Sequence, residues 1–429
     1  MQSKVSDPEQ ARQFAFDVVG RLREAGFQAF WAGGCVRDEL LGRIPVDYDV
    51  ATSAKPDEVR EVFGRRRTLA VGAAFGVITV LGPRDQAGSG IRDAGQIEVA
   101  TFRTDAAYTD GRHPAGVTFS SPEEDAQRRD FTINGLFLDP VTGVVHDYVG
   151  GREDLKAGVV RAIGVPAMRF GEDHLRMLRA VRFAAGFGFA LDGETRAAIE
   201  KMTHLVTTVS PERIAAELRA MVSRPGRRRA LELLDKTGLA REVLMEVAPA
   251  ANDAAALADW QQAARIIDAL DEPDLSTALA ALFERAGAAS LRHAAARLRL
   301  SNREIKLACW LVDAVAALGH ATEAAEELAR RKWSLVQPWL AHDDAFLLAD
   351  LLRARADCGR GSGAAAAWVT AQLARPRDEL DPPPLLTGSD LLAAGVAAGR
   401  SLGEMLAQLR ALQLDGQITT REAALEWLK

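Results

Sequence analysis

The spacing of apolar residues divides the chain into an N-terminal part of mixed periodicity and a helical remainder. Up to about residue 150, short apolar runs typical of strands alternate with amphipathic stretches typical of helices. The predicted strands are 27–32, 46–52, 76–81, 97–101, 136–139 and 144–148, and the predicted helices lie around 9–25, 35–41 and 56–63. Beyond about residue 165 the strand patterns stop, so residues 165–429 are expected to be helical throughout. The pattern predicts an α+β fold.

Local signals indicate where segments begin and end. Ser210 followed by Pro211 is typical of a helix start, because serine caps the first turn and proline fits the first helical position. The glycines of 359–363 and the three prolines within 380–385 are typical of turns or linkers. We expect four parts, with boundaries at 1–150, 151–225, 226–380 and 381–429.

Composition indicates an ordinary soluble protein of several domains. The chain has 429 residues, 48% of them hydrophobic and 26% charged, and this length suggests about three domains. There is no run of the roughly 20 apolar residues that a membrane span needs, and the first ten residues lack the apolar core of a signal peptide. The three cysteines, Cys35, Cys309 and Cys358, are too far apart to suggest a disulfide framework or a zinc site. We therefore expect a cytoplasmic protein without membrane contact.

The charge of the chain bears on its partners. A net charge of −6 argues against indiscriminate nucleic-acid binding, which normally needs a strongly basic surface. Arginines are nevertheless clustered at 65–67, 128–129, 176/179/182 and 227–229, although such runs are often only solvated surface. An acidic protein with local basic patches is consistent with an RNA ligand that is recognised by its shape and is released after each turnover.

The strongest chemical signal lies between residues 30 and 50, in FWAGGCVRDELLGRIPVDYDV. Two adjacent glycines lack Cβ atoms, so their backbone can approach a polyphosphate at the start of the following helix. Asp47 and Asp49 are two positions apart on a predicted strand, which directs both carboxylates to one face. Such oxygen ligands suit Mg²⁺, which prefers carboxylates together with substrate phosphates. A glycine pair or a D-x-D alone is usually just a turn or a strand edge, but this order of elements favours nucleotide chemistry.

The string GGxVRD…DxD resembles the signature of the nucleotidyltransferases related to DNA polymerase beta. It is most similar to the bacterial class II branch, the CCA-adding tRNA nucleotidyltransferases and their poly(A) polymerase relatives. The resemblance implies that Gly34 and Arg37 contact the triphosphate and sugar of an incoming nucleotide and that Asp38 orients Arg37. It also implies that Asp47 and Asp49 are the catalytic, metal-binding carboxylates.

Two further segments of the N-terminal part belong to this resemblance. Glu98, on a predicted strand, is either a third metal carboxylate or an ordinary surface residue of that strand. The segment 103–119, which includes DGRHP, is similar to the loop between the first two motifs of the family.

The block RRDFTINGLFLDP, residues 128–140, resembles the second motif of the family. The resemblance implies that Arg129 reaches the triphosphate, where a guanidinium fork matches phosphate oxygens. We expect Asp130 and Asn134 to hold the local fold instead.

A third block, RFGEDHLRMLRAVRFAA, begins at residue 169. Asp173 and Arg176 are three apart on a predicted helix, so their side chains are expected to be neighbours. A carboxylate acceptor beside a guanidinium donor matches the edges of cytosine and adenine, whereas uracil and guanine present the reverse pattern and would leave polar groups unpaired. Arg179 and Arg182 follow at three-residue steps and are candidates for phosphate or primer contacts. An amphipathic helix with solvated arginines is the alternative, but the block resembles the nucleobase-reading motif of the class II enzymes.

The resemblance implies a nucleotidyltransferase head with a mixed β-sheet and helices, followed by an all-helical neck, body and tail. The implied activity is Mg²⁺-dependent, template-independent transfer of CMP and AMP from CTP and ATP to the 3′ end of tRNA, with the tail binding the acceptor–T arm. A poly(A) polymerase, an enzyme that adds only the terminal A, and a non-catalytic RNA-binding protein remain alternatives. The AHDD around His342 lacks partner histidines for a phosphohydrolase site, and no protein partner is indicated.

Overall fold

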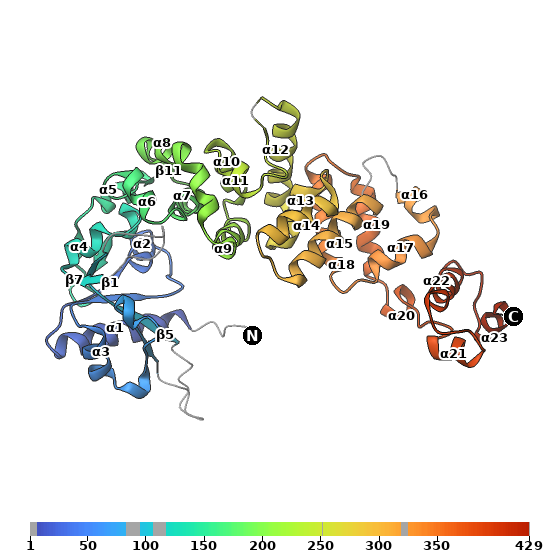
Figure 1. Ribbon diagram of the computed structural model, residues 1–429, viewed down its shortest axis with the longest axis horizontal. Helices are drawn as coiled ribbons and strands as arrows, with labels where there is room; N and C mark the ends of the chain where they lie inside the picture. Colours follow the sequence, from blue (N-terminus) through green and yellow to red (C-terminus); the bar gives the residue numbers. More distant parts are fainter. Residues whose placement is uncertain (1–6, 83–94, 106–116, 251, 319–324, 429) are drawn as a thin grey trace. The chain divides into compact units, whose positions relative to one another are not determined.

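The computed structural model describes residues 7–82, 95–105, 117–250, 252–318 and 325–428. They form two compact units (Figure 1), the first from residues 1–217 and 233–243 and the second from 218–232 and 244–429. The DGRHP segment at 110–114 lies outside the described residues. The four-part division expected from the sequence stays a prediction.

The first unit is built on a seven-stranded mixed sheet in the order β3-β4-β5-β2-β1-β8-β9. Its strands are β1 (Ala29–Ala32), β2 (Asp49–Thr52), β3 (Thr68–Leu69), β4 (Val77–Leu81), β5 (Gln96–Thr101), β8 (Leu136–Leu138) and β9 (Val145–Asp147). All six strands expected from the sequence are present. Only β2 and β5 run parallel, with Asp49 in register with Glu98, and the other pairs are antiparallel.

Strand β2 begins three residues later than expected. Ile44 and Val46 are 75% and 86% exposed, so these two apolar side chains lie outside the sheet core. Asp47 consequently occupies a bend just ahead of the strand, and Asp49 is the first residue of β2.

Helices α1 (Pro8–Glu24) and α3 (Pro56–Phe63) pack on one face of the sheet (Figure 1). The core on this face includes Val18, Leu22 and Trp31, all fully buried. The opposite face carries an aromatic cluster in which Phe30 lies 6.2 Å from Phe102, measured between ring centroids. The alternation of Phe30 and Trp31 along β1 thus fills both faces, as expected for a strand buried on two sides.

Five short strands, β3 of the large sheet and two separate pairs, were not expected from the sequence. Strands β6 (Arg103–Asp105) and β7 (Val117–Phe119) form an antiparallel pair. Strands β10 (Val159–Val160) and β11 (Ala190–Leu191) form a parallel pair. The expectation that residues 165–429 are helical throughout is therefore wrong at β11. Two-residue strands carry no alternation of their own, so the hydrophobic pattern cannot reveal them.

The remaining helices of the first unit lie around the strands, and several of them contribute residues to the candidate site described below. They are α2 (Gly34–Leu40), α4 (Pro122–Gln127), α5 (Gly151–Ala157), α6 (Pro166–Glu172), α7 (Arg176–Phe187), α8 (Gly193–Met202) and α11 (Leu239–Val243), with the 3₁₀ turns η1 (Arg65–Arg67), η2 (Ala73–Phe75), η3 (Thr132–Asn134) and η4 (Thr203–Thr208). Helix α9 (Pro211–Val222) begins at the expected proline and runs from the first unit into the second.

The second unit is helical in the part that the structure describes. Its helices are α10 (Arg227–Lys236, shared with the first unit), α12 (Ala254–Ala269), α13 (Leu275–Phe283), α14 (Gly287–Arg297), α15 (Asn302–Leu318), α16 (Ala325–Arg330), α17 (Trp333–Leu340), α18 (Ala345–Asp357), α19 (Gly363–Leu373), α20 (Arg377–Leu380), α21 (Gly388–Ala393), α22 (Arg400–Leu414) and α23 (Arg421–Trp427). Among the described residues, no helix is long and apolar enough to cross a membrane.

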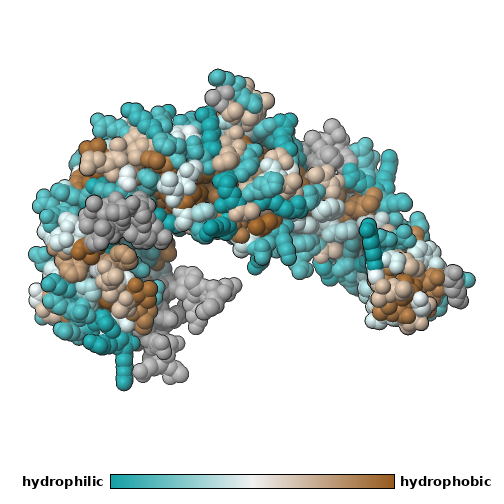
Figure 2. Space-filling model, viewed as in Figure 1, coloured by the Kyte–Doolittle hydropathy of each residue, from teal (hydrophilic) through white to brown (hydrophobic). Residues whose placement is uncertain are grey.

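Helices α21 to α23 share a small hydrophobic core of their own. Its buried members are Leu386, Leu391, Leu409, Ile418 and Ala424. The hydropathy surface shows apolar side chains gathered over these last helices (Figure 2), where Leu392, Leu425 and Trp427 are exposed. This C-terminal cluster is joined to α17 by hydrogen bonds from the backbone and hydroxyl of Ser334 to Asp415, at 2.9 and 3.0 Å.

Candidate functional site

A cavity of about 550 Å³ in the first unit collects residues from all three sequence motifs. Its lining comprises Gly33, Gly34, Arg37, Asp47, Asp49, Arg128, Arg129, Asp130, Asn134, Asp173, Leu175, Arg176, Arg179, Phe183 and Arg213. Residues as far apart in the chain as 33 and 213 therefore share one site. Of the nucleotide- and metal-binding candidates chosen from the sequence, Arg182 and the alternative metal ligand Glu98 are missing from the lining.

The glycine pair allows the side chain of Arg129 to lie close to the backbone at the start of α2. Gly33 has a positive φ of 73°, and a Cβ atom there would lie only 2.8 Å from Nη1 of Arg129. Only glycine fits both the backbone conformation and this approach. Gly34 then begins the helix.

Arg37 is buried on α2 and held from two sides. Its Nε donates to Asp38 at 2.9 Å and its Nη1 to the side-chain oxygen of Asn134 at 2.7 Å, and it lies over the ring of Phe187 at 4.5 Å. Burial lowers the pKa of Arg37, with the carboxylate of Asp38 opposing the shift. The expected contact between Asp38 and Arg37 is present, so this guanidinium has a fixed position in the cavity wall.

Asp47 and Asp49 bring negative charge to the cavity, and Glu98 is the register partner of Asp49 on the neighbouring strand β5. Solvent reaches the Asp49 side chain through the open side of the cavity, yet the protein around it desolvates the carboxylate. This desolvation, together with repulsion from Asp47 and Glu98, raises the pKa of Asp49 to about 6. Within the described part of the chain, neither Asp47 nor Asp49 forms an ion pair. A cation bound there would relieve the repulsion.

The pair Asp47 and Asp49 fits a divalent cation that takes most of its ligands from substrate and water. Among the described residues, no group of three or more His, Cys, Asp and Glu side chains forms a complete metal cage. Mg²⁺ does not require one, because it binds through one or two carboxylates plus substrate phosphates. The donor chemistry of the site therefore suits Mg²⁺.

Arg128 and Arg129 share a carboxylate that sequence reasoning missed. Asp125 is buried at the end of α4 and accepts from Nε of Arg128 at 2.9 Å and from Nη2 of Arg129 at 3.0 Å. Burial opposes ionisation of Asp125, but the two guanidiniums outweigh it and lower the pKa. The signal was available, because Asp125 precedes the arginines by three and four positions, the helical spacing of an ion pair.

Asp130 and Asn134 hold the local structure, as expected. The carboxylate of Asp130 accepts two hydrogen bonds from Arg179, at 2.9 and 2.7 Å, and one from the amide of Asn134 at 3.0 Å. Burial disfavours the charged form, but Arg179 and these hydrogen bonds prevail and lower the pKa of Asp130 to about 2. Arg179 of α7 is thereby fixed to the second motif.

The expectation that Asp173 and Arg176 are neighbours on one helix is wrong. Helix α6 ends at Glu172, and α7 begins at Arg176. Asp173 is extended, with φ −148° and ψ 105°, and its Oδ1 accepts from the backbone N–H of Leu175 at 3.1 Å. A carboxylate that binds nearby backbone N–H groups competes with helix formation, which accounts for the break.

Asp173 is paired with Arg213. Nη1 and Nη2 of Arg213 donate to the two oxygens of Asp173 at 3.2 and 2.7 Å. Sequence reasoning missed Arg213, which is 40 positions away on α9, and no local pattern connects the two residues.

Arg176 lines the same cavity but has other partners. Its guanidinium donates to Glu172, to the carbonyl of Arg169 at 3.0 Å and to the carbonyl of Arg128 at 3.3 Å. Arg182, one turn beyond Arg179 on α7, instead pairs with Glu217 at 2.6 Å.

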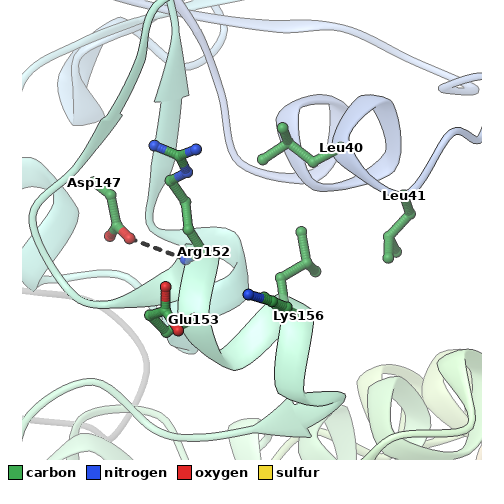
Figure 3. A pocket seen from close by; sticks show the side chains of 7 residues that line it. Leu40, Leu41, Asp147, Arg152, Glu153 and Lys156 are labelled. Carbon is green, nitrogen blue, oxygen red and sulfur yellow. Dashed lines mark hydrogen bonds between the residues drawn. The ribbon is translucent and has the colours of Figure 1, made fainter.

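A second cavity, of about 700 Å³, lies between the end of α2 and the start of α5 (Figure 3). Leu40 and Leu41 line one side, and Arg152 and Lys156 of α5 line the other. Asp147 accepts from the backbone N–H of Arg152 at 2.9 Å and caps α5. This cavity is larger, but it contains none of the candidate residues chosen from the sequence, so the 550 Å³ cavity is the candidate site.

Comparisons with known proteins show which proteins this chain resembles. Residues 29–161 match the family described as Poly A polymerase head domain, and residues 188–251 match the probable RNA and SrmB-binding site of polymerase A. A curated CCA-adding enzyme of Geobacillus stearothermophilus is 41% identical over 228 residues, 53% of this chain and 53% of the relative. That of Listeria monocytogenes is 43% identical over 224 residues, 52% of this chain and 53% of the relative.

Over these segments the chain is similar to poly(A) polymerases and CCA-adding enzymes. It spans about half the length of the curated relatives it matches. The fold likeness extends further. The crystal structure of the Bacillus stearothermophilus CCA-adding enzyme in complex with CTP has a TM-score of 0.73 and 28% identity, covering 97% of this chain and 96% of that chain. The Thermotoga maritima CCA-adding enzyme complexed with tRNA, with a TM-score of 0.64 and 20% identity, covers 99% of this chain and 96% of its own and shares the fold.

Proposed function

We propose that this protein is a template-independent CCA-adding enzyme, which transfers CMP and AMP from CTP and ATP to the 3′ end of tRNA and releases pyrophosphate. The observation that carries the proposal is the meeting of two unpaired carboxylates, Asp47 and Asp49, with the base-reading candidates Asp173 and Arg176 in one cavity. The relatives named as CCA-adding enzymes support it.

In this proposal Asp47 and Asp49 hold Mg²⁺, with Glu98 as a possible third ligand. The bound ions would supply charge neutralisation and lower the pKa of the attacking hydroxyl. The chain's own contribution is positioning, because in-line attack of a 3′-hydroxyl on an α-phosphate requires aligned reactants more than covalent chemistry.

Three groups are proposed to receive the triphosphate and sugar. Gly34 offers a backbone without Cβ, Arg37 is fixed by Asp38 and Asn134, and Arg129 is held on Asp125. A guanidinium already held by a carboxylate loses less side-chain entropy when it binds phosphate oxygens.

Asp173 and Arg176 are proposed to read the base. Asp173 would accept the amino group of cytosine or adenine, and Arg176 would donate to the adjacent ring nitrogen. Uracil and guanine would leave both groups unmatched, a mismatch that can reject a nucleotide by ~10⁴-fold. Arg179 is proposed to contact phosphate. Arg182 is a weaker candidate, because its salt bridge to Glu217 lies outside the cavity lining.

The proposed partner is the acceptor–T arm of tRNA, bound by the second unit and its C-terminal helices. An A-form arm is recognised through shape, 2′-hydroxyls and phosphates. The match to an RNA-binding segment at residues 188–251 supports RNA as the ligand.

Three alternatives remain, of which two use the same chemistry and one is not catalytic. A poly(A) polymerase or an enzyme that adds only the terminal A would use the same cavity, whereas a non-catalytic RNA-binding protein would not need Asp47 and Asp49. The presence of both carboxylates in the cavity lining favours an enzyme.

A matrix of primers and nucleotides tests the proposal. tRNA ending at the discriminator base, at -C and at -CC is incubated with each NTP singly and Mg²⁺. We expect CMP on the first two primers, AMP on the third, and no further addition. AMP alone on -CC would indicate the A-adding enzyme, long A tracts a poly(A) polymerase, and no incorporation the binding protein.

A further inference from the structure

Arg213 lies in the wall of the candidate site and belongs to none of the motifs found in the sequence. It sits in the first turn of α9, and both of its terminal nitrogens donate to Asp173, at 3.2 and 2.7 Å. The two side chains are partly shielded, with 26% and 17% of their surfaces exposed. This is the two-point geometry in which a guanidinium fixes the plane of a carboxylate.

Asp173 needs such support, because it follows the end of a helix and precedes the start of the next. Besides Arg213, the backbone N–H of Leu175 donates to its Oδ1 at 3.1 Å. Oδ1 therefore has two donors and Oδ2 has one, which leaves Oδ2 with capacity for a further donor. Arg176, in contrast, is engaged by Glu172 and by two backbone carbonyls.

We propose that Arg213 is a positioning residue for nucleotide selection, holding Asp173 with Oδ2 available to the amino group of the incoming base. This inference rests on the proposed CCA-adding function. Discrimination requires an acceptor that cannot turn away, because a carboxylate free to rotate could avoid the carbonyl of uracil or guanine. Arg213 acts through Asp173 and does not touch the base itself.

The test compares Arg213→Met and Arg213→Lys with wild type and with Arg219→Met. Arg219 lies on the same helix, pairs with Glu304 at 2.8 Å and is absent from the cavity lining, so its substitution is a matched control. kcat/KM is measured for CTP and UTP on tRNA ending at the discriminator base, and melting temperatures are recorded.

We expect Arg213→Met to lower the CTP-to-UTP ratio of kcat/KM by about tenfold, the order of a coupling between residues in contact. Turnover of CTP should change much less. Arg213→Lys, which keeps the charge but not the fork, should have an intermediate ratio, and Arg219→Met should match wild type.

A double variant distinguishes positioning from direct reading. If Arg213 acts through Asp173, adding Arg213→Met to Asp173→Ala leaves the selectivity of Asp173→Ala unchanged. If the two substitutions together lowered the CTP-to-UTP ratio by the product of their separate effects, Arg213 would not act through Asp173. An unchanged CTP-to-UTP ratio in Arg213→Met or, if that variant does not fold, in Arg213→Lys would also overturn the positioning role. Failure of the wild type to add CMP or AMP would instead refute the proposed function.

Discussion

Arginines of the candidate site are held by neighbouring carboxylates, whereas the proposed metal ligands Asp47 and Asp49 form no ion pair with the residues that the structure describes. Arg129 is fixed on Asp125 and Arg179 on Asp130, each with short donor–acceptor distances. Asp49 lies near Asp47 and has its pKa raised to about 6, by desolvation first and then by repulsion from neighbouring carboxylates. The side chains are thus arranged before any ligand binds, which reduces the cost of binding one.

Replacing Asp173 with Ala should relax base selection. The acceptor for the amino group is lost, and so is the repulsion of the carbonyl of uracil or guanine. We expect the CTP-over-UTP preference to fall by about 2–4 kcal/mol, the scale of an unmatched buried charged partner. Single-nucleotide incorporation assays measure it. If Asp173→Ala kept the wild-type preference, the base would have to be read elsewhere.

Replacing Asp130 with Asn should destabilise the protein, because Arg179 loses its charged partner. The expected cost is about 3 kcal/mol, as for other broken buried pairs. The pKa of Asp130 is lowered to about 2, so its stabilising contribution is complete above the unfolded-state value of about 3.9 and is lost as pH falls toward 2. Chemical denaturation should show a constant difference between pH 7 and 5 that shrinks below pH 4. A difference that grew toward acid pH would contradict this assignment.

At the scale of elements, the hydrophobic pattern predicted the strands with apolar runs, helices α1 to α3 and the helical character of the remainder, though not its individual helices. It could not find β10 and β11, because two residues are too few to show a period. The hydrophobic pattern also predicted one continuous helix through Asp173, because apolar residues follow a helical spacing on both sides of it, in α6 and in α7. The break depends on a hydrogen bond from the backbone N–H of Leu175 to the Asp173 side chain, a local competition that periodicity does not record.

The prediction of site residues has the same limit, because only local spacing is visible in the sequence. Residues within one motif, such as Asp47 and Asp49, were found because their spacing is local. Arg213 was missed because only tertiary packing brings α9 to Asp173. Asp125 was missed although its spacing to Arg129 was visible in the sequence.

Gly33→Ala tests the junction of β1 and α2. The positive φ is expected to cost about 1–2 kcal/mol for a residue with a Cβ atom, and that Cβ would press on Arg129, 2.8 Å away. Displacing Arg129 should raise the KM for ATP and CTP severalfold while tRNA binding stays unchanged. Gly26→Ala is the control, since Gly26 also has a positive φ but nothing within 4 Å of its Cβ position. Equal KM values in both variants would show that the close packing of residue 33 against Arg129 does not affect nucleotide binding.

At the scale of the whole molecule, the chain joins a unit that contains the candidate site to a helical unit whose last helices have a core of their own. A net charge of −6 indicates that RNA affinity rests on a few local contacts. The affinity for tRNA should therefore fall with salt on a shallow slope.

Truncation at Pro382 removes α21 to α23 and tests their part in tRNA binding. We expect the KM for tRNA to rise about tenfold or more and the KM for CTP to remain near wild type. Because α22 packs on α17 through Ser334 and Asp415, circular dichroism and melting must show that the shortened protein folds. If the folded truncation used tRNA as before, these helices would be structural only.

We propose that Asp47 and Asp49 are the carboxylates on which nucleotide addition to tRNA depends. The most direct test is AMP incorporation into tRNA ending in -CC by Asp49→Ala, beside wild type and Asp57→Ala, an exposed carboxylate of α3 outside the cavity. We predict that Asp49→Ala loses incorporation, that Asp57→Ala retains it, and that all three proteins bind the tRNA with similar affinity. Incorporation by Asp49→Ala at more than about a tenth of the wild-type rate, a barrier change of only about 1.4 kcal/mol, would contradict the account.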